Sequence, residues 1–255
     1  MERQLTKRHP APANPSKAKK RAGTAADRVV ELSSRPAHRG LQDAHRILQY
    51  AEETVRHLLR IYDSQQAARG GGAPTTEEQD LLRAMVVFAG AGLDAALKQA
   101  AQDALYDVAQ AQQPAREALA KFVERRLLRG EPEVAALAGV NTKELSRLIL
   151  SGDPLKVAVE SLARDLSGRS LQSFEELQRT LEYFGAANLK LNTQQLRVTF
   201  ENRNRIVHEM DMDLKHRTRK RRARRRDEML DHARVLLETA DKIVTEVDAR
   251  LNSSP

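Results

Sequence analysis

The 255-residue chain contains no cysteine and no tryptophan, and its aromatic residues are limited to four tyrosines and five phenylalanines. The absence of cysteine excludes a disulfide scaffold, a cysteine-ligated zinc site and a cysteine nucleophile. No apolar run approaches the roughly 20 residues of a membrane-spanning helix. No apolar block follows the basic residues near the N-terminus, as a secretory signal would require. We therefore expect a soluble cytoplasmic protein without a membrane partner.

Positive charge is concentrated in two strips of the chain. Residues 1–40 contain ten lysines and arginines against three acidic residues, and residues 215–226 contain nine lysines and arginines and no acid. Because the formal net charge of the whole chain is +8, the remainder is mildly acidic. Such strips favour a polyanionic partner, of which RNA is the commonest. The alternative is a solubilising tail and a solvated helix end.

Apolar residues recur at three- and four-residue spacing along most of the chain, and no stretch alternates at period two, which predicts an all-α fold. We predict a helical bundle with additional short helices over residues 41–255. Residues 1–40, rich in Pro, Ala, Lys and Ser, are predicted to be a disordered basic arm. The predicted helices run from 42 to the glycines at 70–72 and over 75–109, 115–128, 132–138, 142–150, 154–166, 173–184, 193–210 and 222–251.

Local signals predict several helix ends. A threonine at 75 or 76 is suited to cap the helix after the glycines. Ser173 and Glu176 have the spacing of a capping box, and Gly185 is suited to end the helix that this box begins. The segment Gly90-Ala91-Gly92 lacks the strand and the Gly-Lys-Ser/Thr of a phosphate loop. We expect its small residues to serve close helix–helix contact.

The most specific pattern is the segment Glu201-Asn202-Arg203-Asn204-Arg205-Ile206-Val207-His208-Glu209. On a helix, Asn204 and His208 share a face, and the long side chain of Arg203 can reach the same side. RNA is cut without a metal when a base takes the 2′-hydroxyl proton, an acid protonates the leaving 5′-oxygen and positive charge stabilises the phosphate. Histidine suits the acid or base near pH 7, arginine holds phosphate oxygens, and asparagine orients a hydroxyl or phosphate oxygen.

The spacing alone is common in an arginine-rich chain. It recurs at Arg3/His9, Arg39/His45, and Arg225 or Arg226 with His232. Only Arg203 is followed by asparagine, and only His208 is preceded by two apolar residues that should bury the turn. The alternative is that His208 lies at the edge of the core, with Arg203 and Glu209 as surface ion-pair partners.

The segment with Phe184-Gly185, Leu196, Phe200 and Arg203-Asn204-x-x-x-His208 resembles the HEPN superfamily of all-α proteins. Its form Arg-Asn-x-Ile-Val-His-Glu is most similar to the RiboL-PSP group. The resemblance covers residues 41–251, with its motifs in 174–212. It implies a bundle of HEPN type and a metal-independent endoribonuclease of toxin or effector type that uses no cofactor. It also implies a homodimer with Arg203, Asn204 and His208 as active-site residues at the interface, and an antitoxin or regulatory protein as a further partner.

A dimer also has a physical reason. One imidazole cannot easily serve as base and acid at opposite ends of an in-line displacement. A two-fold axis through the site would supply a second His208 and a second Arg203.

The basic strip near the motif is predicted to bind the RNA backbone, since it lacks the aromatic residues that would read bases. The predicted RNA-binding residues are Arg219, Lys220, Arg221, Arg222, Arg224, Arg225 and Arg226. No metal site is expected, because His45 and His57 lack the i, i+4 spacing of a metal pair. Asp211 and Asp213 are expected to form a solvated turn. The remaining histidines, His9, His38, His216 and His232, are expected in basic or exposed surroundings.

Three hypotheses remain from the sequence. The first is the dimeric endoribonuclease that attacks through the 2′-hydroxyl. The alternative is a non-catalytic helical RNA- or partner-binding module that retains the motif. A third is a helical scaffold whose basic segments touch an anionic membrane surface.

Overall fold

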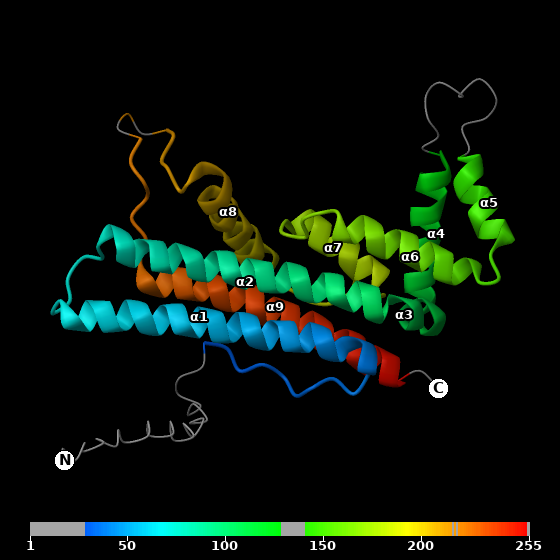
Figure 1. Ribbon diagram of the computed structural model, residues 1–255, viewed down its shortest axis with the longest axis horizontal. Helices are drawn as coiled ribbons and strands as arrows, with labels where there is room; N and C mark the ends of the chain where they lie inside the picture. The colour runs from blue at the N-terminus through cyan, green and yellow to red at the C-terminus, as the bar shows by residue number, and fades with distance from the viewer. Residues whose placement is uncertain (1–28, 129–140, 216, 218, 254–255) are drawn as a thin grey trace, which may run out of the picture.

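A computed structural model of the chain describes residues 29–128, 141–215, 217 and 219–253. Three long helices lie side by side and form the body of the molecule (Figure 1). Leucines from all three, including Leu48, Leu93 and Leu237, are fully buried at the centre of the core. The three helices are α1 (Gln42–Ala68), α2 (Thr76–Asp103) and α9 (Arg226–Ser253).

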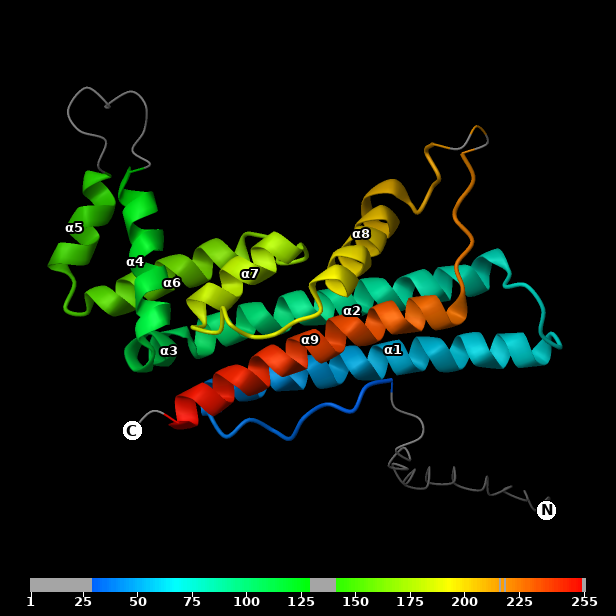
Figure 2. The same ribbon diagram turned by 180° about the vertical axis from the view of Figure 1, so that it is seen from behind.

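Shorter helices form a second layer over α2 (Figures 1 and 2). Helices α4, α5 and α6 pack together at one end of the body, and α7 contacts both α4 and α8. Over the described residues the only β-type pairing is one isolated bridge, so the prediction of an all-α bundle is confirmed. The shorter helices are α3 (Leu105–Ala111), α4 (Gln113–Leu128), α5 (Thr142–Leu150), α6 (Pro154–Ser167), α7 (Phe174–Tyr183) and α8 (Thr193–Glu209). No helix within the described ranges combines the length and apolarity needed to cross a bilayer.

Several predicted helix ends are confirmed. Thr75 begins α2 with a capping box, in which its hydroxyl accepts from the Glu78 amide at 3.3 Å and its own amide donates to the Glu78 carboxylate at 2.7 Å. Ser173 caps α7, and Gly185 ends it in the left-handed conformation at a φ of 66°.

Other helix bounds differ from the prediction. The helix predicted over 75–109 is interrupted at Ala104, which divides it into α2 and α3. The helix predicted from 222 begins only at Arg226, because residues 222–225 form an approach to α9 that is not helical. The helix predicted over 132–138 lies outside the described residues.

Residues 29–40 form an ordered strap along α1 and α9, so the prediction of a disordered arm is wrong for this part of it. Carboxylates of the two helices accept hydrogen bonds from its main-chain amides. The N–O distances are 3.0 Å for Val29 to Glu52, 3.0 Å for Ser33 to Asp241 and 2.7 Å for His38 to Asp248. Val29 and Val30 are buried in the core. The amino-acid composition of the segment cannot reveal these carboxylate partners, which lie 23 to 210 residues away in the chain. The rest of the predicted arm, residues 1–28, lies outside the described residues.

The small residues of α2 serve close contact with α1 at Gly92, as predicted. A Cβ atom built on Gly92 would lie 2.3 Å from the Cβ atom of Ala51, so no side chain fits there. Gly90 instead faces two side chains from outside α1. Its built Cβ atom would lie 3.3 Å from Gln172 Oε1 and 3.6 Å from Arg203 Cγ.

We expect Gly92→Ala to lower the free energy of unfolding by about 1–3 kcal/mol, because the added methyl group would push α1 and α2 apart. Gly90→Ala is the matched control on the same helix. It gains helix propensity of about 1 kcal/mol or less, and its added methyl group would meet side-chain atoms at 3.3 Å or more, not another helix at 2.3 Å. Urea denaturation at neutral pH measures both changes. A Gly92→Ala variant as stable as Gly90→Ala would contradict the close contact.

Candidate functional site

Helix α8 carries the predicted motif and rests on α2, α7 and α9. Asn192 caps its first turn by accepting from the Gln195 amide at 3.2 Å. The apolar side chains Leu196, Phe200 and Ile206 are buried and anchor the helix on the body. This anchoring leaves the polar motif residues at the remaining surface of the helix.

Arg203 is half-buried on the side of α8 that faces Gly90 of α2. Its Nη1 donates to Asn204 Oδ1 at 3.1 Å, and its Nε is buried without a hydrogen-bond partner. Burial lowers the pKa of Arg203, and the charge of Asp94 opposes this effect. Arginine nevertheless remains charged at neutral pH. Gln172, whose Oε1 is also buried without a partner, was not foreseen as a neighbour of the motif.

Arg203 differs from the other arginines that are at least partly buried. Within the described ranges, Arg203 has no carboxylate at ion-pair distance, whereas every other partly or fully buried arginine has at least one. Those paired arginines are Arg56, Arg83, Arg126, Arg169, Arg205, Arg222, Arg224, Arg226, Arg234 and Arg250. A partly desolvated guanidinium without a counter-ion is suited to receive an anion, because charge-assisted hydrogen bonds to it are strong.

His208 lies in the last turn of α8, and its side chain is exposed. Its imidazole makes no hydrogen bond or ion pair with any residue that the structure describes. Arg203 and Glu209 likewise form no ion pair there, so the alternative arrangement of surface ion pairs is not seen. The structure joins Arg203 and Asn204 by a hydrogen bond, and His208 stands one turn beyond Asn204 without a hydrogen bond or ion pair to either.

The chain leaves α8 through a turn that is held from the inside. Met210 and Asp211 adopt the left-handed conformation at φ values of 52° and 59°. The Asp211 carboxylate is fully buried, and Arg224 donates to both of its oxygens at 2.6 and 2.8 Å. Arg83 of α2 adds a third bond at 2.8 Å. The expectation of a solvated turn is therefore wrong for Asp211.

The pKa of Asp211 reflects two opposed effects. Burial raises the pKa of this carboxyl group, but the hydrogen bonds and charges of Arg224 and Arg83 outweigh burial and lower it below its usual value. Asp211 is therefore ionised, and it ties the end of α8 to α2 and to the approach to α9.

A buried chain of hydrogen bonds continues from Arg224 to His232, which was expected in basic or exposed surroundings and is buried. Arg224 Nη1 donates to Asn202 Oδ1 at 3.1 Å, so the amide nitrogen of Asn202 faces His232 Nε2 at 2.9 Å. The amide nitrogen of Asn202 is a donor, so His232 Nε2 must accept this hydrogen bond. The imidazole proton is therefore on Nδ1, which donates to the Thr199 hydroxyl at 2.9 Å. His232 is thus neutral and joins α9 to two positions of α8.

The free energy of unfolding is expected to fall as the pH drops below about 6.5, the usual pKa of histidine. Burial lowers the pKa of His232, Arg224 acts in the same direction, and Glu228 and Asp231 oppose it. The unfolded chain therefore binds a proton that the folded chain does not, so stability rises with pH in this range. Burial also lowers the pKa of His45, which adds an effect of the same sign.

Urea denaturation at pH 7.5 and at pH 5.5 tests this expectation. His232→Gln removes the titrating group and should reduce the difference between the two pH values. A wild-type protein equally stable at both would show that neither histidine is held neutral by the fold.

The strip that follows the motif forms a hairpin-like loop between α8 and α9. Met212 and Arg221 form an isolated antiparallel bridge. The Asp213 amide donates to the Lys220 carbonyl at 2.8 Å, and the Arg222 amide donates to the Asp211 carbonyl at 2.9 Å. The loop projects beyond α8 and away from the three-helix body (Figures 1 and 2). We call residues 211–225 the basic hairpin.

The predicted RNA-binding residues divide into two groups. Arg224 is buried in its contact with Asp211, so we remove it from the predicted set. Three more form ion pairs: Arg221 with Asp80 at 2.7 Å, Arg222 with Asp213 at 3.3 Å and Arg226 with Asp63 at 2.7 Å. The other three, Arg219, Lys220 and Arg225, are exposed and have no ion pair with a described residue.

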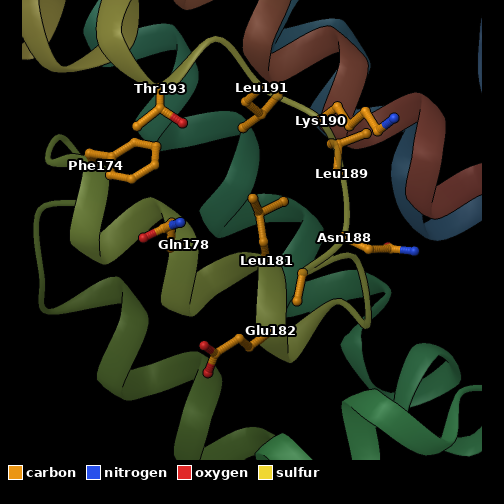
Figure 3. Close-up of a pocket in the computed structure, with 10 residues that line it drawn as sticks. Phe174, Gln178, Leu181, Glu182, Asn188, Leu189, Lys190, Leu191 and Thr193 are labelled. Carbon is orange, nitrogen blue, oxygen red and sulfur yellow. The ribbon is translucent and has the colours of Figure 1, made fainter.

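A separate cavity of about 370 Å³ lies between α7 and the connection from α7 to α8 (Figure 3). Its wall includes Phe174 and Gln178 of α7 and Leu191 of the connection, and none of Arg203, Asn204 and His208 lines it. Asn188 and Lys190 point away from Phe174. The cavity therefore adds no acid or base to the motif.

The described ranges contain no group of three or more His, Asp or Glu side chains arranged to hold a metal ion. Comparison of the chain with protein-family models, with curated proteins and with solved structures finds no match in any of the three.

Proposed function

We propose that this chain is a metal-independent endoribonuclease of the HEPN type, with Arg203, Asn204 and His208 as its active-site residues. The observation that carries the proposal is the half-buried guanidinium of Arg203, which has no carboxylate partner among the described residues and lies five residues before an exposed imidazole on the same helix. The basic hairpin begins directly after this imidazole and supplies a path for the RNA backbone.

In the proposed reaction, Arg203 holds a non-bridging oxygen of the scissile phosphate and stabilises the charge that develops in the transition state. Asn204 orients the attacking hydroxyl or a phosphate oxygen. His208 takes the proton of the 2′-hydroxyl, whose oxygen then attacks phosphorus while the bond to the 5′-oxygen breaks. The leaving 5′-oxygen takes a proton from a second imidazole. The products are a 2′,3′-cyclic phosphate and a 5′-hydroxyl.

The second imidazole in this proposal is His208 of another copy of the chain. Three exposed apolar side chains surround His208 in sequence: Val207, Met210 and Leu214, which are 39, 63 and 55% exposed. A symmetric contact over this end of α8 would cover them and bring two motifs together. Sedimentation equilibrium measures this association, and Met210→Glu should weaken it.

The test is incubation of the purified chain with a labelled RNA in EDTA. Cleavage is expected, with product ends that carry a 2′,3′-cyclic phosphate. A matched substrate with one 2′-deoxy residue at the cleaved position should stay intact, because it lacks the attacking hydroxyl. An absence of cleavage over a wide range of protein concentrations would contradict the proposal.

A second candidate, an RNA-binding module without catalysis, is favoured by the basic hairpin itself. Of the nine lysines and arginines at 215–226, four are neutralised by Asp80, Asp213, Asp211 and Asp63. With at most five contacts left, the slope of log affinity against log salt for single-stranded RNA should be no steeper than about −3.5. Titrations between 50 and 300 mM salt measure the slope. A slope near −6, the value for nine contacts, would show that the ion pairs open on binding.

A further inference from the structure

A pocket of about 360 Å³ lies between α4, α6 and α7 and is lined mainly by arginine and aromatic side chains. The helices that line it, α4, α6 and α7, lie toward the end of the body opposite the basic hairpin (Figures 1 and 2). None of the three motif residues lines it. Its lining residues are Phe122, Arg125, Arg126, Asn141, Asp165, Arg169, Arg179 and Tyr183.

The pocket carries more positive than negative charge. Its four guanidinium groups meet two carboxylates. Asp165 lies 2.7 Å from Arg169 and 4.0 Å from Arg126. Glu176, just outside the lining, lies 2.6 Å from Arg179 and 3.7 Å from Arg169. Four positive and two negative charges leave an excess of two positive charges.

The excess charge belongs chiefly to two adjacent arginines in the last turn of α4. Arg125 donates to the Tyr183 hydroxyl at 3.0 Å and to the Lys121 carbonyl at 3.2 Å, and has no carboxylate partner in the described ranges. Arg126 lies over the Phe122 ring at 5.7 Å from its centroid. The rings of Phe122 and Tyr183 pack edge to face with their centroids 6.2 Å apart, and both side chains are almost fully buried. Tyr183 and Phe122 thus hold both guanidinium groups at the pocket, with part of the donor capacity of each unused.

We propose that this pocket binds the dianionic phosphate of a phosphomonoester. Such a group carries a charge of about −1.5 to −2 at pH 7 and three acceptor oxygens, which matches the excess of two charges and the planar donors of arginine. The volume is at the small end for ligand pockets and suits a sugar phosphate or a mononucleotide. The phosphate can belong to a free small molecule or to the 5′ end of an RNA. This inference does not rest on the proposed nuclease activity.

Isothermal titration of the full chain with AMP, at constant ionic strength, tests the site. AMP is expected to bind saturably, and 3′,5′-cyclic AMP, whose phosphodiester has only one charge, is expected to bind at least tenfold more weakly. Competition against AMP by a 5′-phosphorylated oligoribonucleotide, but not by its 5′-hydroxyl form, would identify an RNA end as a source. If neither oligoribonucleotide competes with AMP, the source of the phosphate is a free small molecule. Equal binding of AMP and cyclic AMP, or no binding of AMP, overturns the proposal.

Variants locate the binding. Arg125→Gln and, separately, Arg179→Gln should each weaken AMP binding about tenfold or more, as loss of a charged hydrogen bond implies. Arg164→Gln, which removes the same charge from an exposed position on α6 outside the pocket, should leave affinity unchanged, and so should Arg203→Gln. Loss of binding in Arg203→Gln with retention in both pocket variants would place the anion at the motif and overturn the proposal. Urea denaturation confirms that each variant is folded.

Discussion

Replacement of His208 by alanine is expected to reduce RNA cleavage by a factor of about 10² to 10⁴, the range that a positioned general acid or base contributes. The side chain is exposed and makes no hydrogen bond or ion pair with a described residue, so its removal should leave the free energy of unfolding within about 0.5 kcal/mol of the wild-type value. A large loss of rate without a loss of stability would separate a catalytic role from a structural one. Single-turnover cleavage of labelled RNA in EDTA measures the rate.

His57→Ala is the matched control for this variant, because His57 is also exposed and lies on α1, outside the motif. It should cleave RNA at the wild-type rate. If the chain acts as a toxin or effector, expression of the wild type and of His57→Ala should arrest growth, and expression of His208→Ala should not. Equal cleavage by His208→Ala and the wild type would end the nuclease proposal.

Replacement of Asp211 by asparagine is expected to lower the free energy of unfolding by about 3–5 kcal/mol, the cost of removing one partner from a buried ion pair. The side chain keeps its shape and loses its charge, so Arg83 and Arg224 would stay buried beside each other with only the half-exposed carboxylates of Asp80 and Glu228 as counter-ions. The end of α8 would lose its ties to α2 and to the approach to α9. Urea denaturation at pH 7 measures the change.

Asp213→Asn is the control two residues away. Its carboxylate is partly exposed and pairs with Arg222 at 3.3 Å, so its loss should cost about 1 kcal/mol or less. Because the pKa of Asp211 is lowered in the fold, its contribution is present above the usual carboxyl pKa and is lost as the pH falls through the lower folded value. This acid range is separate from the loss of stability attributed to His232. Similar stability of the two asparagine variants would show that Asp211 holds no more than a surface pair.

The helices could be predicted from sequence wherever their signals are local. The cap at Thr75, the stop at Gly185 and the close contact at Gly92 each depend on residues a few positions apart or on the absence of a side chain. These features hold in the structure. The all-α class follows for the same reason, since the three- and four-residue spacing of apolar residues reports directly on helical faces.

Features that depend on distant partners could not be predicted. Asp211 and His232 look like surface residues in sequence because charged and polar side chains are mostly exposed in folded proteins. Their partners, Arg83 and Thr199 among them, lie 128 and 33 residues away. The late start of α9 has the same origin, because Arg224 reaches back to Asp211 instead of continuing the helix. The absence of a carboxylate beside Arg203 also could not be predicted from the sequence, because it depends on all the side chains that the fold places around the guanidinium.

The strap over residues 29–40 is attached in part through its backbone, and this has a consequence for how the segment can vary. Glu52 and Asp248 bind the main-chain amides of Val29, Ala37 and His38, not their side chains. These bonds would survive almost any substitution in the strap, and proline alone, which has no amide hydrogen, would remove one. A related chain could therefore keep these hydrogen bonds with a different strap sequence, provided that the acidic residues of α1 and α9 are kept and that the buried Val29 and Val30 and the closely packed Gly40 are respected.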